Sequence, residues 1–278
     1  MTDHVAGKSI VITGAGGGFG SLVARKAAAR GARVTLGDIN LDAAEAVAAE
    51  IRAAGGQAQA VQVDVTRLDQ VKALVGAALS AFGGIDVMVN NAGIMPLAFF
   101  SDHEAAYGAW ERCIDINIKG VLNGMVAAYD PMIAQGRGQV INISSIYGNF
   151  PVVGAAVYGA SKAAVNTLGE SLRLESRGKI KVTTIKPTGV PATGLSASVV
   201  NPAASVGILG QNAPDFMAMV AEMQAGTFPP ARLDPENIDY ASLAPEHIAD
   251  AVVYAINQPW GVSLGEITVR AAGDHFIL

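Results

Sequence analysis

Short runs of consecutive apolar residues recur along the chain and alternate with longer stretches in which apolar residues follow a helical spacing. Such runs are typical of strands buried on both faces of a parallel sheet. Seven of them predict strands: SIVITG, ARVTLGD, AQAVQVDV, IDVMVNNAG, GQVINISS, KVTTIKP and, near the end, SLGEITVR. The periodic, alanine-rich stretches between them predict helices near residues 19–30, 41–54, 67–82, 106–135 and 157–177.

This alternation is the βαβ order that builds a doubly wound fold. The length of 278 residues suits one large domain, and neither an internal repeat nor a charged linker divides the chain. We therefore predict the α/β class, with a single Rossmann-type domain over residues 1–278 and a mostly parallel, seven-stranded sheet.

Residues 188–242 interrupt the alternation, because they contain six prolines and only one convincing helical pattern, near 214–225. An insertion of this length in a compact domain is usually a lid or a binding loop. A disordered linker is the alternative. The helical pattern has an apolar face that favours burial and therefore a substrate lid, formed by Met217, Met219, Val220 and Met223.

Composition narrows the classes of function. The net charge of −5, from 19 basic and 24 acidic residues without a basic run, argues against binding to nucleic acid. Although 51% of the residues are hydrophobic, no apolar run reaches the roughly 18 residues of a membrane span. The only cysteine, Cys113, excludes an intrachain disulfide, and the N-terminus lacks the pattern of a signal peptide. We expect a cytoplasmic protein with no membrane partner.

A glycine-rich motif follows the first predicted strand. Its pattern is T-G-x-x-x-G-x-G, as Thr13, Gly14, Gly18 and Gly20, and not the common G-x-G-x-x-G, because position 19 is Phe19. Between a strand and a helix, free N–H groups and the helix dipole favour a pyrophosphate, and glycines permit close approach. We predict that residues 14–20 bind a dinucleotide. A purely structural turn is the alternative.

Asp38 stands at the end of the next predicted strand, about 20 residues beyond the glycines. A carboxylate at this place accepts both hydroxyls of an adenosine ribose and repels a 2′-phosphate. Neither the loop 15–19 nor the pair 39–40 supplies a basic residue for that phosphate. The sequence therefore predicts NAD and not NADP, with a solvated surface acid as the alternative.

Three further motifs follow in order: NNAG at 90–93, NISS at 142–145 and YGASK at 158–162. Together with the glycine motif, they resemble the classical short-chain dehydrogenase/reductase superfamily over about residues 6–190. The resemblance implies that Tyr158 is the catalytic acid and base, with Lys162 as its partner. It also implies that Ser145 polarises the substrate carbonyl and that Asn117, in DINIKG, relays protons.

The same resemblance assigns further cofactor contacts. It places Asp64 and Val65 at the adenine, and Asn91 on the strand beside the cofactor. It also implies nicotinamide contacts from Pro187, Val190 and Thr193. The chain departs from the family here: in KPTGVPATG, Thr188 takes the place of the usual glycine, and the threonine that normally follows is displaced to Thr193.

Elementary chemistry agrees with the tyrosine and lysine pair. Tyr158 and Lys162 are four residues apart and therefore share one face of a helix. The ammonium group and the positive nicotinamide ring are together expected to lower the pKa of the phenol from about 10 toward neutrality, which proton exchange with an alcohol requires. A buried tyrosine beside a surface lysine is the alternative.

The expected substrate pocket is apolar. Its candidate residues follow NNAG and the serine motif: Ile94, Met95, Pro96, Ile146, Tyr147, Phe150 and Pro151. Few charges among them favour an uncharged, fairly hydrophobic secondary alcohol or ketone. The four histidines are scattered without the spacing of a metal site, so we expect no metal.

We therefore predict an oxidoreductase that transfers a hydride between NAD(H) and a secondary alcohol or ketone. A 3-oxoacyl-thioester reductase would want NADPH and basic residues near the pocket, and neither is evident. A non-catalytic regulator that senses NAD would not need the four catalytic positions intact. The apolar stretches 106–135 and 157–177 match helices that pair into tetramers in the resembled family, so we expect a homotetramer.

Overall fold

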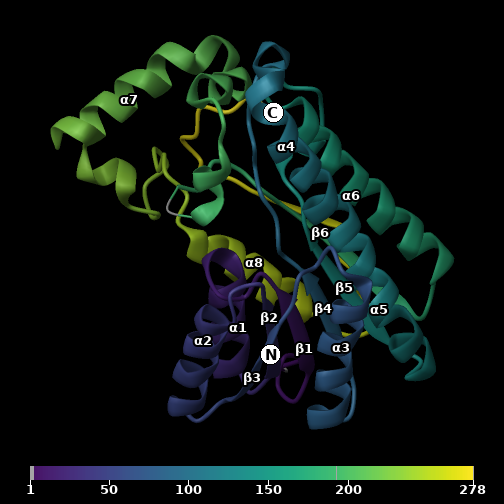
Figure 1. Ribbon diagram of the computed structural model, residues 1–278. Helices are drawn as coiled ribbons and strands as arrows, with labels where there is room; N and C mark the ends of the chain where they lie inside the picture. Colours follow the sequence, from purple (N-terminus) through teal and green to yellow (C-terminus); the bar gives the residue numbers. More distant parts are fainter. Residues whose placement is uncertain (1–2, 192, 278) are drawn as a thin grey trace.

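The computed structural model describes residues 3–191 and 193–277. They contain a seven-stranded sheet in the order β3-β2-β1-β4-β5-β6-β7, in which all neighbouring strands run parallel (Figure 1). The strands are β1 (Ser9–Thr13), β2 (Arg33–Asp38), β3 (Gln57–Gln62), β4 (Val87–Asn90), β5 (Gly138–Ile143), β6 (Ile180–Pro187) and β7 (Glu266–Val269). The predicted fold class is confirmed, and the sheet is entirely parallel.

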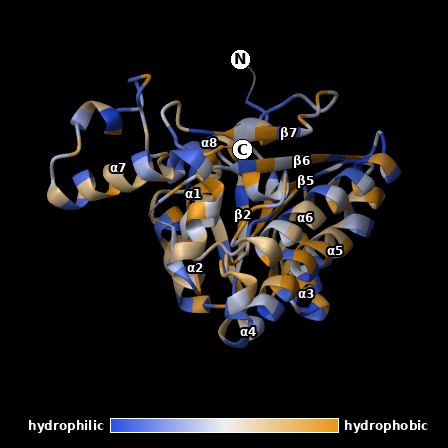
Figure 2. Cartoon of the chain, turned by 90° about the horizontal axis from the view of Figure 1, so that it is seen from above, coloured by the Kyte–Doolittle hydropathy of each residue, from blue (hydrophilic) through white to orange (hydrophobic). Residues whose placement is uncertain are grey.

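Helices cover both faces of this sheet, as Figure 2 shows from above. Helices α1, α2 and α8 pack on one face, and α3, α5 and α6 pack on the other. The α-helices are α1 (Gly18–Ala29), α2 (Leu41–Ala53), α3 (Leu68–Phe82), α4 (His103–Cys113), α5 (Gly120–Ala134), α6 (Ala156–Glu175), α7 (Ala213–Ala225) and α8 (Pro245–Ile256).

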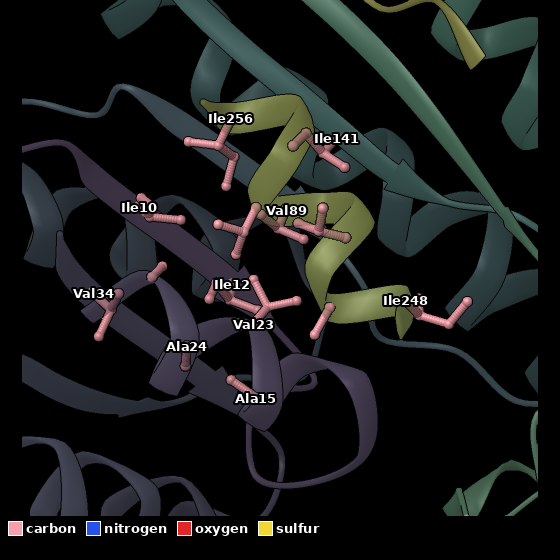
Figure 3. Close-up of a cluster of buried hydrophobic side chains, with 14 of the residues drawn as sticks. Ile10, Ile12, Ala15, Val23, Ala24, Val34, Val89, Ile141, Ile248 and Ile256 are labelled. Carbon is pink, nitrogen blue, oxygen red and sulfur yellow. The ribbon is translucent and has the colours of Figure 1, made fainter. Parts of the chain in front are cut away.

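The two cores follow from the alternation of side chains along each strand. In β1, Ile10 and Ile12 point into the cluster beneath α1 and α8, where they pack with Val23 and Ile256 (Figure 3). Val11, between them, belongs to the cluster on the opposite face. Because both faces are dry, the strand is apolar at consecutive positions, and this explains the continuous apolar runs in the sequence.

The structure differs from the predicted helices at two places. The stretch 106–135 is not one regular helix: α4 and α5 are separated by a π-helical segment, Ile114–Lys119. Helix α8 was not predicted, although Pro245 stands in its first turn and Ile248 and Val252 lie on its buried face. No described helix is long and apolar enough to cross a membrane.

Strand order creates a crevice at the carboxyl ends of the strands. The connection from β1 goes to β2 on one side, whereas β4 pairs with β1 on the other, so the chain changes direction at this point. Ligands of doubly wound sheets bind in the crevice at such a switch point. Residues 188–191 and 193–242 lie beyond the same edge, and α7 projects from the body of the molecule (Figure 1).

Candidate active site

The turn between β1 and α1 is packed so tightly that two of its glycines have no room for a side chain. A Cβ on Gly14 would lie 2.8 Å from Cα of Ala92, and one on Gly20 would lie 2.4 Å from the carbonyl oxygen of Gly14. Asn91 donates through Nδ2 to the carbonyl oxygens of Thr13 and Gly14, both at 2.9 Å. The predicted cofactor residue Asn91 therefore fixes the turn against β4.

The start of α1 leaves room for a ligand. Gly17, the residue before the helix, makes no side-chain cap, and a Cβ on Gly17 or Gly18 would meet nothing within 4 Å. Uncapped N–H groups at a helix N-terminus, with open space beside them, form a site for an anion. Phe19 packs partly on the core and lines the cavity described below. The turn therefore fits the pyrophosphate of a dinucleotide.

Asp38 ends β2 beside this turn. Its Oδ2 accepts the N–H of Gly16 at 2.8 Å, and its Oδ1 accepts the N–H of Asn40 at 2.9 Å. These bonds orient the carboxylate, and each oxygen keeps a lone pair for a further donor. Asp38 is thus placed to accept hydroxyl groups of a ribose.

Asp64 and Val65 follow β3 and form a fixed turn. Oδ1 of Asp64 accepts the backbone N–H and the hydroxyl of Thr66, at 2.9 and 2.7 Å. The carbonyl oxygen of Val65 accepts Nδ2 of Asn123 at 2.8 Å, and its side chain is packed against Gly120. Both residues lie at the carboxyl edge of the sheet, outside the large cavity.

Ser145, Tyr158 and Lys162 come together where β5 meets α6. Tyr158 and Lys162 lie on the first turns of α6 and are buried, and the side chain of Ser145, just after β5, is hydrogen-bonded with that of Tyr158. Nζ of Lys162 lies 5.7 Å from the centre of the Tyr158 ring and donates to the carbonyl oxygen of Ile143 at 2.9 Å. Tyr147 contacts Tyr158 edge to face.

The pKa values of this pair are set mainly by burial. Burial raises the pKa of Tyr158 above its ordinary value of 10.0, and the hydrogen bond with Ser145 offsets only part of that rise. Burial also lowers the pKa of Lys162 to about 8. Burial thus keeps the pKa of Tyr158 high in the chain without cofactor. The expected lowering by Lys162 together with the nicotinamide ring stays a prediction.

Asn117 lies in the π-helical segment, a kind of irregularity that often occurs at functional sites. Its Oδ1 accepts the N–H of Ile94 at 2.9 Å, and its Nδ2 donates to the carbonyl oxygen of Ile94 and to Oγ of Ser161, at 2.9 and 3.0 Å. A Cβ on Gly93 would lie 3.2 Å from Oδ1 of Asn117 and 3.6 Å from Nζ of Lys162. The asparagine thus borders the same small space as the lysine.

A cavity of about 740 Å³ opens in front of these groups. Many predicted site residues line it: Phe19, Asn91, Met95, Ser145, Ile146, Tyr147, Tyr158, Lys162, Pro187, Val190 and Thr193. Four pocket candidates do not, namely Ile94, Pro96, Phe150 and Pro151. The side chain of Phe150, which follows the short turn Ile146–Gly148, is 63% exposed. We leave Phe150 out of the proposed substrate site.

The lid supplies the far wall of the cavity. Met217, Met219, Val220 and Met223 all line it, so the apolar face of α7 is directed at the cavity. Met219 is buried there, whereas Met217 remains 57% exposed. The predicted helix near residues 214–225 is confirmed as α7, but its whole apolar face is not buried, and its role as a substrate lid stays a prediction.

The C-terminal segment completes the wall, and sequence reasoning did not find it. Phe276 lies so close to Gly189 that a Cβ on this glycine would come within 1.8 Å of the phenyl ring. The hydroxyl of Thr188 donates to Oδ2 of Asp274 at 3.3 Å, and Arg270 forms an ion pair with Asp274 at 2.8 Å. Thr188, where the chain departs from the family, therefore anchors the C-terminal segment.

Lys186 is a second residue that the sequence did not reveal. Its buried ammonium group donates to Oδ1 of Asn149 at 2.7 Å and pairs with Glu266 at 2.6 Å. Asn149 ends the turn that begins at Ser145. A buried charge without partners is costly, so this arrangement ties the turn after Ser145 to β6 and β7.

No group of three or more His, Cys, Asp or Glu residues within 3–191 and 193–277 is arranged to hold a metal ion. Cys113 is buried, and burial raises the pKa of its thiol. His275, by contrast, lines the cavity.

Comparisons with known proteins agree with the motifs. The family model described as short chain dehydrogenase matches residues 8–203. The chain is 39% identical over 201 residues to 2,5-dichloro-2,5-cyclohexadiene-1,4-diol dehydrogenase LinX of Sphingobium indicum, with 72% of this chain and 79% of that protein covered. It is 33% identical over 267 residues to glycine betaine reductase ATRR of Emericella nidulans, which covers 96% of this chain but only 19% of that protein.

Solved structures show the same architecture. The complex of 7α-hydroxysteroid dehydrogenase with NADH and 7-oxo glycochenodeoxycholic acid has a TM-score of 0.78 and 27% identity, over 99% of this chain and 97% of that one. A metagenomic short-chain oxidoreductase in complex with NADP has a TM-score of 0.72 and 29% identity, over 96% of this chain and 98% of that one. Similar folds thus hold either nicotinamide dinucleotide.

Proposed function

The chain belongs to the short-chain dehydrogenase family, as its motifs predicted, and from this premise we propose that it transfers a hydride between NAD(H) and an uncharged, fairly hydrophobic secondary alcohol or ketone. One observation carries the proposal: Ser145, Tyr158 and Lys162 converge on one wall of a mainly apolar cavity that adjoins the glycine turn. A sensor of NAD has no need of this arrangement.

The choice of NAD rests on Asp38. Its carboxylate is oriented by two backbone N–H groups, and the next positions, Ile39 and Asn40, carry no positive charge for a 2′-phosphate. The NADH complex of 7α-hydroxysteroid dehydrogenase supports this choice, whereas the NADP complex of the metagenomic oxidoreductase shows that the fold alone does not decide it.

The side chains divide the chemistry among themselves. When bound, the nicotinamide supplies or receives the hydride. Oγ of Ser145 donates to the substrate oxygen and holds it beside Tyr158. This hydrogen bond polarises the carbonyl. The hydroxyl of Tyr158 gives a proton to that oxygen in reduction and takes one in oxidation. Because burial raises the pKa of Tyr158, the chain by itself holds this phenol protonated, as ketone reduction requires.

Proton supply runs through the groups around Gly93. Lys162, whose pKa is lowered by burial to about 8, exchanges a proton near neutrality more readily than an ordinary lysine. Asn117 borders the same space and fixes the backbone of Ile94 on both sides. We assign Asn117 to the proton path, and we assign Lys162 to reprotonating Tyr158.

We also propose a homotetramer in the reducing cytoplasm. Apolar side chains on the outer faces of α4, the π-helical segment and α5 are left exposed: Tyr107, Ile114, Leu122 and Val126. Light scattering is expected to give four times the monomer mass of 28.4 kDa. A stable monomer would contradict this assembly.

A cofactor and substrate screen tests the function. Secondary alcohols with NAD or NADP, and the corresponding ketones with NADH or NADPH, are followed by the absorbance of the reduced cofactor. We expect turnover with NAD(H) and a preference of about tenfold or more over NADP(H), equivalent to about 1.4 kcal/mol. Asp38→Ala should reduce this preference. Equal efficiencies in the wild-type enzyme would reject NAD specificity, and no turnover with any pair would reject the activity.

A further inference from the structure

The C-terminal segment brings His275 to the wall of the large cavity, next to the first turns of α7. Its ring packs edge to face on Phe216 at the start of α7, with 6.1 Å between ring centres. Its carbonyl oxygen accepts Nδ2 of Asn212 at 3.0 Å, and the next residue but one, Ile277, donates to the carbonyl oxygen of Ile208 at 3.1 Å. The ring is thus held in place from both sides.

The hydrogen-bonding groups of this ring are unused. Among the described residues neither nitrogen of His275 has a hydrogen-bond partner, and Nδ1 is fully buried. A buried N–H without an acceptor is more costly than a buried lone pair, so the neutral tautomer that fits carries its proton on Nε2. Nε2 is then a donor, and the cavity is the place where a ligand can meet it.

The side chains around His275 indicate what kind of ligand its Nε2 would bind. The side chains near it in the cavity are apolar, including Phe216, Met219 and Phe276. Ser242 is the polar neighbour from the adjoining segment, which is joined to the tail by the N–H of Gly273 and the carbonyl oxygen of Tyr240 at 2.8 Å. A few fixed polar groups in a mainly apolar wall are how a binding site selects a polar group on a hydrophobic ligand, and the ring of His275 is held in place as such a donor.

We propose that His275 recognises a second, uncharged oxygen on the substrate, remote from the carbon that reacts. The substrate class is then a ketone or secondary alcohol on an apolar, ring-sized scaffold whose far end carries a carbonyl or hydroxyl oxygen that accepts the Nε2 hydrogen. This inference rests on the proposed function, since it assigns the reacting end of the substrate to Ser145 and Tyr158.

A matched pair of ketones tests this recognition. The probes are 4-cyclohexylcyclohexanone and 4,4′-bicyclohexanone, which differ only in a carbonyl group at the far ring. The measured quantity is the ratio of kcat/KM for the diketone to that for the monoketone, with NADH. His275→Phe keeps an aromatic ring against Phe216 but removes the donor. The control is His247→Phe, because His247 also packs edge to face on an aromatic ring, Tyr240, but does not line the cavity.

We expect the ratio to fall about tenfold in His275→Phe, the size of one hydrogen bond to a fixed donor, and to stay unchanged in His247→Phe. An unchanged ratio in His275→Phe, or an equal fall in both variants, would overturn the proposal. His275→Gln, which restores a donor, should recover part of the ratio.

Calorimetry separates this inference from the proposed function. Both ketones are titrated into Tyr158→Phe protein saturated with NADH, with and without His275→Phe. Tighter binding of the diketone that depends on His275, without turnover in the wild-type enzyme, would keep the recognition and reject the activity. Failure of both ketones to bind would reject the substrate class and, with it, the role of His275.

Discussion

The two halves of the cavity are built differently. On the cofactor side, the turn Thr13–Gly20 is held by hydrogen bonds from Asn91 and by glycines that have no room for a side chain. On the lid side, α7 packs through Phe216 and Met219 on small apolar clusters, whereas Met217 and Met223 stay partly exposed.

The two halves suit different tasks: the cofactor side suits the transfer of proton and hydride, and the lid side suits the selection of a substrate. Hydrogen-bonded turns at the edge of a rigid sheet keep reacting groups in one geometry, which proton and hydride transfer require. Methionine-lined walls adapt to the shape of a hydrophobic ligand. With the proposed function, the reaction takes place on the sheet side, and we expect the lid side and the C-terminal segment to select the substrate.

A substitution in the rigid half should have the largest effect on folding. Gly20→Ala places a Cβ 2.4 Å from the carbonyl oxygen of Gly14 and 2.6 Å from Nδ2 of Asn91. We expect the free energy of unfolding to fall by about 1–3 kcal/mol, the usual cost of overpacking, measured by urea titration. Gly17→Ala is the control, because its Cβ would meet nothing within 4 Å. Equal stability of the two variants would show that the turn is not rigid.

The buried lysine gives the rigid half a distinct dependence on pH. Burial lowers the pKa of Lys162 from 10.5 to about 8, so between these values the unfolded chain binds a proton that the folded chain lacks, and stability rises with pH. Above about pH 10, Tyr158 acts in the opposite sense, because burial raises its pKa and the folded chain then retains a proton.

The comparison variant is Lys162→Met, which keeps an unbranched apolar side chain without the charge. Between pH 8 and pH 10 we expect the free energy of unfolding of the wild-type protein to rise by on the order of 1–2 kcal/mol more than that of this variant. Urea unfolding at four pH values across this window measures the difference. Parallel curves for the two proteins would mean that the ammonium group is not buried as the structure has it.

A substitution in the lid should change binding more than stability. Met219→Ala removes a buried side chain that lines the cavity from α7. We expect KM for a hydrophobic ketone to rise several-fold, with a loss of less than about 1 kcal/mol in unfolding free energy, because the lid relaxes around the gap. Ile12→Ala, in the core below the sheet, should instead cost about 2–5 kcal/mol. A comparable loss from both would contradict the division into two halves.

The sheet side could be predicted from sequence because its determinants are local. The central strands β1 and β4 are apolar at consecutive positions, and the glycine turn, Asp38 and the pair Tyr158 and Lys162 lie at short, fixed spacings. The sequence spacing also placed the lid helix, since Met219 and Met223 share one face.

The rest depends on contacts between distant parts of the chain. His275 reaches the cavity because Asp274 is bound by Thr188, 86 residues earlier, and no sequence pattern encodes that pairing. The π-helical segment around Asn117 interrupts a pattern that a regular helix would also produce. The rise in the pKa of Tyr158 in the chain without cofactor could not be read from the sequence, because desolvation depends on the whole cavity and not on the four-residue spacing to Lys162.

Turnover by Tyr158→Phe is the most direct test of the central claim, that this phenol exchanges the proton of the substrate. The variant keeps the ring that packs against Tyr147 and removes only the hydroxyl. With NAD binding checked by calorimetry, kcat should fall by about 10² to 10⁴, the usual contribution of a positioned acid or base. A folded variant that binds NAD and oxidises the alcohol at nearly the wild-type rate would contradict the account.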